Sequence, residues 1–115
     1  MIGQISLRDL TAQVELIPQA IIKEPVRAVA RRLNVDYERG CDDFDLYEGI
    51  GIILDGRQKF ALMHYQGHPA NTFTIYLPHG IRDVGRITKM ISRITEELKI
   101  SKSLIEWQRK DNPLL

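Results

Sequence analysis

The sequence predicts an α+β domain in which a three-stranded antiparallel meander is covered by a C-terminal amphipathic helix. Three segments of alternating apolar residues, at about 45–55, 59–66 and 72–78, are separated by turn residues, and an apolar stripe with helical spacing follows over about 81–99. A helix that lies on a sheet buries the apolar surface of both, so we expect these elements to form two layers. One or two shorter helices are expected before the meander.

The three strand segments are each supported by local signals. Gly49 and Gly51 alternate with larger apolar residues in the first segment, and the pair Asp55-Gly56 that follows is typical of a tight hairpin turn. A longer polar turn over 66–71 separates the second segment from the third. Small residues on one face of a strand indicate close approach of another element, and we expect the last helix or a ligand there.

The helix segments have recognisable ends. Ser6 is a candidate N-cap for a first helix that ends before Pro18, although residues 11–17 also fit an extended strand. Pro25 suits the first position of a second helix, which should end near Asn34. Pro78 and Gly80 end the third strand, and the last helix then carries its apolar stripe on Val84, Ile87, Ile91, Ile94 and Leu98.

Two segments have weaker patterns. Residues 36–48 carry six acidic side chains against one arginine, which predicts a solvated loop that leads into the sheet. Residues 101–110 fit either an edge strand or a short helix, and the sequence leaves both open.

Composition limits the class of protein. A chain of 115 residues with a net charge of +1 suits one globular domain, 1–115, with no global field that demands nucleic acid or an anionic membrane. The N-terminus lacks the pattern of a signal peptide, and no apolar run is long enough for a membrane span. Cys41 is the only cysteine, so we expect a cytoplasmic protein without disulfides, and we expect no cofactor.

The turn end of the meander provides candidate ligand-binding residues. Histidine titrates near neutral pH and suits acid–base chemistry, so a pocket here would serve a small enzyme or a ligand-binding domain. A metal site is not expected, because four residues along a strand separate side chains by about 13 Å. The candidates are His64, Tyr65, His68, Asn71 and His79.

The last helix and the tail provide candidate partner-binding residues. Four cations recur at steps of three and four residues on the side away from the apolar stripe, and one tryptophan follows in the tail. Their contrast with the acidic segment 36–48 suits a protein partner or a second copy of the chain, and nucleic acid is a weaker alternative. These candidates are Arg82, Arg86, Lys89, Arg93 and Trp107.

No catalytic signature is present, because the sequence contains no nucleophile elbow, P-loop or helical metal-binding motif. The sequence therefore favours a small non-enzymatic binding or regulatory module that acts through protein–protein interaction as a homodimer. The alternative is the enzyme or ligand-binding domain with its site at 64–79.

Overall fold

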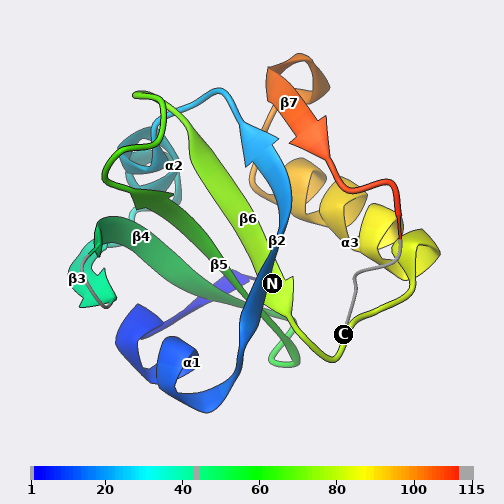
Figure 1. Cartoon of the computed structure of the whole chain (residues 1–115), viewed down its shortest axis with the longest axis horizontal. Helices are drawn as coiled ribbons and strands as arrows, with labels where there is room; N and C mark the ends of the chain where they lie inside the picture. The colour runs from blue at the N-terminus through cyan, green and yellow to red at the C-terminus, as the bar shows by residue number, and fades with distance from the viewer. Residues whose placement is uncertain (1, 43–44, 112–115) are drawn as a thin grey trace.

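A computed structural model describes residues 2–42 and 45–111 of the chain. Within these ranges the fold is α+β, with three α-helices and one sheet of seven antiparallel strands (Figure 1). In chain order the elements are β1 (Ile2–Ile5), α1 (Leu7–Gln13), β2 (Leu16–Ile22), α2 (Val26–Leu33), β3 (Glu38–Asp42), β4 (Asp45–Leu54), β5 (Gln58–Tyr65), β6 (Phe73–Pro78), α3 (Val84–Glu97), a 3-10 turn (Lys102–Leu104) and β7 (Ile105–Gln108).

The strand order across the sheet is β1-β4-β5-β6-β2-β7, and β3 also pairs with β4. Strands β1 and β3 therefore share one edge of β4. The pairs Ile2↔Leu54 and Ile5↔Gly51 place β1 along the second half of β4, and Glu38↔Gly49 begins the pairing of β3 along the first half.

The predicted meander is confirmed as β4, β5 and β6, which are neighbours and antiparallel. The expectation that three strands make the whole sheet is wrong, because β1, β2, β3 and β7 join it. The sequence predicted a helix that ends before Pro18, or an extended strand over 11–17, whereas β2 runs through Pro18 from Leu16 to Ile22. The register of β2 against β6 shifts between Pro18 and Ala20, and a proline is tolerated at such an irregularity because its missing N–H breaks no ladder bond there.

Most of the described part of the acidic segment is strand and not loop, and residues 43–44 lie outside the described residues. Residues 38–42 and 45–54 form the β3–β4 hairpin, in which Arg39 lies opposite Glu48. The main-chain pairing of the two strands therefore forms in spite of their acidic composition. In the tail, where the sequence left two possibilities open, the short 3-10 turn precedes the edge strand β7.

The helices begin and end at capping residues. Ser6 Oγ accepts a hydrogen bond from Asp9 N–H at 3.4 Å at the start of α1, and Asn34 ends α2 in the left-handed conformation with φ 57°. Helix α3 occupies 84–97, which is shorter than the expected 81–99, because the Asp83 carboxylate accepts a hydrogen bond from Arg86 N–H at 3.0 Å and caps the helix there. None of the helices in the described ranges has the length and apolar composition needed to span a bilayer.

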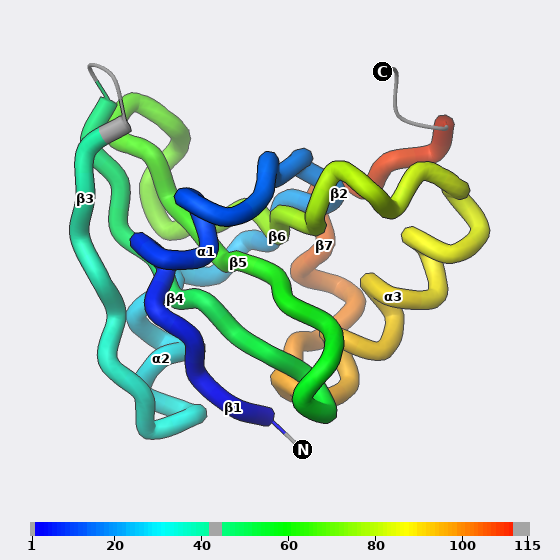
Figure 2. Tube along the Cα trace, turned by 90° about the horizontal axis from the view of Figure 1, so that it is seen from below, coloured from blue at the N-terminus to red at the C-terminus, as the bar shows by residue number. Residues whose placement is uncertain are grey.

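The sheet has a buried cluster on each face. Ile50, Leu62 and Ile75 pack in one cluster with buried residues of α2 and α3, whereas Ala61 and Met63 pack on the other face with α1. Figure 2 shows α1 and α2 on opposite sides of β4 and β5. The last helix does not make the close approach expected at the two glycines of β4. At Gly51 the neighbours are Ile5 of β1 and Leu7 of α1, and at Gly49 they are Leu7 and the β5 main chain at Leu62 and Met63.

Candidate functional site

Four of the five candidate ligand-binding residues lie at the β5–β6 turn. His64 Nε2 is 3.2 Å from the carbonyl oxygen of Pro69, and the ring of His68 lies 6.0 Å from that of Tyr65. Asn71 has φ 60°, a left-handed conformation that asparagine tolerates better than most residues. These contacts order the turn.

The fifth candidate, His79, does not join them. His79 follows β6 at its far end, where its N–H donates to the carbonyl oxygen of Glu15 at 2.8 Å. The pairing of Ala61 with Tyr76 puts His79 about six residues along the strands from His64, which is roughly 20 Å. Within the part of the chain that the structure describes, no three histidine, cysteine or acidic side chains gather as metal ligands.

The tyrosines form a row on the α1 side of the sheet. The ring of Tyr65 lies 5.5 Å from that of Tyr47 and 6.4 Å from that of Tyr76, both at steep angles. Burial raises the pKa of the Tyr76 phenol above its usual value, and a hydrogen bond with Thr74 opposes this. Because alternate residues of a strand face opposite sides, His64 lies on the α2 side, apart from this row.

The candidate partner-binding residues are exposed. Arg82 is exposed just before α3 and not on it, Arg86 and Lys89 are exposed on the helix, and Arg93 forms an ion pair with Asp55. Trp107 on β7 is 40% exposed. Figure 1 places α3 and β7 on the side of the molecule away from β3.

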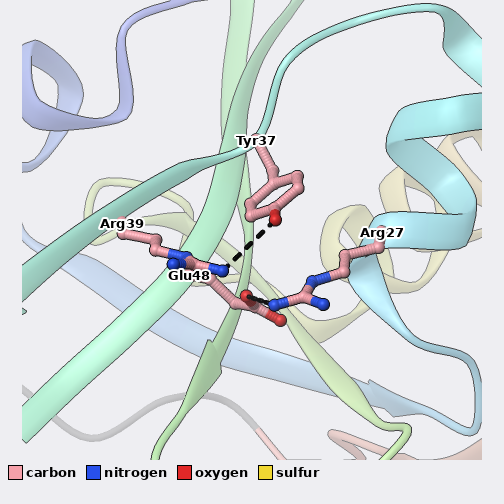
Figure 3. A network of polar contacts seen from close by, with 4 residues as sticks. All are labelled: Arg27, Tyr37, Arg39 and Glu48. Atoms are coloured by element: carbon pink, nitrogen blue, oxygen red, sulfur yellow. Dashed lines mark hydrogen bonds and ion pairs between the residues drawn. The ribbon is translucent and has the colours of Figure 1, made fainter.

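A charged cluster that the sequence did not predict lies on the α2 side of β3 and β4. We call Arg27, Tyr37, Arg39 and Glu48 the arginine–tyrosine cluster (Figure 3). The Arg27 guanidinium carbon lies 5.1 Å from the centre of the Tyr37 ring, and that of Arg39 lies 5.7 Å from it. An Nη atom of Arg27 lies 3.1 Å from a carboxylate oxygen of Glu48. An Nη atom of Arg39 donates a hydrogen bond to the Tyr37 hydroxyl at 3.4 Å.

Sheet register brings His64 to this cluster. Glu48 pairs with Arg39 on one side and with His64 on the other, so these three side chains form a row across β3, β4 and β5. The row borders a hollow of about 530 Å³. Its rim includes Leu46, which is 54% exposed, the highest value among the large apolar residues described. The lining residues are Arg27, Arg39, Gly40, Leu46, Tyr47, Glu48, His64 and Gln66.

The charges around the hollow do not balance. Glu48 neutralises Arg27, whereas Arg39 forms no ion pair with any residue of the described ranges. Tyrosine faces attract guanidinium groups, so Tyr37 holds both arginines in place without cancelling their charge. An arginine held in this way is suited to bind a carboxylate through two parallel hydrogen bonds.

Sequence reasoning missed this cluster because it took residues 36–48 for a loop. The available signal was the two-residue spacing of Tyr37 and Arg39, which places both side chains on one face of an extended chain. The contributions of Arg27 and Glu48 depend on how α2 packs and on strand register, which no local pattern contains.

Comparison with models of known protein families, with curated proteins and with solved structures gives no significant match.

Proposed function

We propose that this protein is a non-enzymatic binding module whose arginine–tyrosine cluster captures an acidic side chain of a protein partner. The observation that carries the proposal is the unbalanced charge of Arg39, held against Tyr37 at the edge of a partly apolar hollow. A partner carboxylate would supply the anion that Arg39 lacks among the described residues, and its neighbouring residues would cover Leu46.

The exposure of the cluster favours a protein partner over a small molecule. The side chain of Arg27 is 51% exposed, and small-molecule sites usually enclose most of the ligand. A protein surface that covered the hollow would exclude water and strengthen the bond between guanidinium and carboxylate. Arginine and tyrosine are also the residue types that contribute most binding energy at protein interfaces.

The test is binding of a fluorescent hexaglutamate peptide, measured by fluorescence anisotropy. The variants Arg27→Gln and Arg39→Gln each remove one charge and keep much of the side-chain length. Arg57→Gln is the matched control. Arg57 is exposed in the β4–β5 turn at the other end of β4, and its replacement changes the net charge by the same amount.

We expect Arg39→Gln to weaken hexaglutamate binding about tenfold or more. The affinity of Arg57→Gln for the peptide should stay within about twofold of that of the unmodified protein. Binding should also weaken as salt is raised, because it depends on charge. Equal binding of neutral hexaglutamine, or equal losses in Arg39→Gln and Arg57→Gln, would contradict the proposal. Circular dichroism of each variant checks that the fold is unchanged.

A further inference from the structure

Strand β7 is the last strand at one edge of the sheet, and its outer side pairs with no other described strand. Two main-chain hydrogen bonds fasten its ends to β2: Lys23 N–H donates to Leu104 O at 2.7 Å, and Arg109 N–H donates to Gln19 O at 2.9 Å. Main-chain groups alternate in direction along an extended strand. Since Arg109 N–H points to β2, the N–H and C=O of Gln108 point away from the molecule.

The side chains around Gln108 are presented in a fixed arrangement. Arg109 Nε donates to Gln19 Oε1 at 2.7 Å, and an Nη of Arg109 donates to Pro18 O at 2.9 Å. The Arg109 guanidinium carbon lies 5.7 Å from the centre of the Trp107 ring. Arg109 is thus held in place by neutral acceptors and keeps its charge, while Trp107 is 40% exposed beside it.

The sequence of this edge is complementary to itself. In an antiparallel pair of two β7 strands with Gln108 opposite Gln108, Trp107 of each copy lies opposite Arg109 of the other. Glu106 then lies opposite Lys110. Each of these pairs occurs twice, and each joins a cation with an aromatic ring or with an anion. Because the outward groups belong to Gln108, this register also lets the two Gln108 residues exchange main-chain hydrogen bonds.

We infer that a second copy of this chain binds along β7 in this register, which gives a two-fold dimer whose sheet continues from one copy to the other. Charged side chains on an edge strand exclude indiscriminate pairing. Here the exposed Glu106 and Lys110 have opposite signs at positions related by the two-fold axis, so they match a second copy and reject strands with another charge order. This interface is separate from the arginine–tyrosine cluster and does not depend on the function proposed for it.

The test is sedimentation velocity over about a hundredfold range of protein concentration, since an interface of this small size is expected to be weak. The variants Glu106→Lys and Lys110→Glu each reverse one charge. Because residues 106 and 110 of the two copies face each other at two places in the dimer, each variant puts like charges opposite each other at both places. Each reversal should weaken the dimer roughly tenfold or more, and the double variant with both reversals should restore it. Glu96→Lys is the matched control, because Glu96 is exposed on α3 and takes no part in the proposed strand pairing, so this change should leave the dimer unchanged.

Gln108→Pro provides an independent check. Proline removes the outward N–H that the second copy needs, while the hydrogen bonds of β7 to β2 through Leu104 and Arg109 remain. We expect this variant to be monomeric with an unchanged circular dichroism spectrum. A monomer at every concentration of the unmodified protein, a dimer that persists in Gln108→Pro, or a double charge reversal that fails to restore association would overturn the inference.

Discussion

Replacing Gly51 by alanine should destabilise the protein, because β1 and the start of α1 occupy the space that a side chain needs. Gly51 lies opposite Ile5 in the β1–β4 ladder. A β-carbon at this position would lie 2.5 Å from the Ile5 carbonyl oxygen and 3.3 Å from Leu7 Cα. Both obstacles are main-chain atoms, so no change of side-chain rotamer relieves the contact.

The size of the effect follows from these distances. An ordinary contact needs at least about 3.5 Å, so the β1–β4 ladder would have to open by about 1 Å. Forced insertion of one carbon into a packed site costs roughly 1–3 kcal/mol, and we take about 2 kcal/mol. That cost is roughly a thirtyfold change in the folding equilibrium constant. For a chain of this size it lowers Tm by about 8 °C.

The assay is thermal and urea unfolding followed by circular dichroism, with Gly80→Ala as the matched control. No atom lies within 4 Å of a β-carbon built on Gly80. Alanine there should therefore leave stability unchanged or raise it by up to about 1 kcal/mol, because it restricts the unfolded chain. If Gly51→Ala proves as stable as Gly80→Ala, the reasoning that β1 and α1 pack directly on this glycine is refuted.

Two further predictions concern the end of α2 and the partly buried Tyr76. Asn34 has φ 57°, a conformation that glycine adopts more easily than asparagine and alanine adopts less easily. In urea unfolding, Asn34→Gly should therefore stabilise the protein and Asn34→Ala should destabilise it by about 1 kcal/mol. The opposite order would refute the capping role. Burial raises the Tyr76 pKa above 10.0, so the unfolded chain ionises first and the free energy of unfolding falls as the pH rises past that value. Tyr76→Phe should make this fall shallower as the pH rises through and above about 10, and equal slopes in the two proteins would contradict the assignment.

The elements that the sequence predicts well are those with strong local signals. The strands of the meander are six to ten residues long, and the turn between the first two contains Asp55 at φ 55° and Gly56 at φ 68°, the conformation expected for this pair. Ser6 and Asn34 cap helices at the expected positions. In each case the residues that stabilise the element lie within it or beside it in the chain.

The candidate site was only partly predictable, because its residues come from segments that are distant in the chain. His64 lines the hollow, but nothing in the sequence joined it to Arg39 or to Arg27. His79, chosen with it, lies at the other end of the strands because β5 and β6 are antiparallel. Distances between such residues depend on strand order and register.

By itself the sequence determined the α+β class, the central meander, the start of α1 at Ser6 and the end of α2 at Asn34, because alternation, turn residues and capping residues act over a few positions. Only the tertiary structure decided that β1, β2, β3 and β7 complete the sheet, and that α2, β3 and β4 bring two arginines to one tyrosine. Short strands gain their stability from neighbours distant in the chain, and the free energy of those long-range contacts leaves no periodic trace in the local sequence.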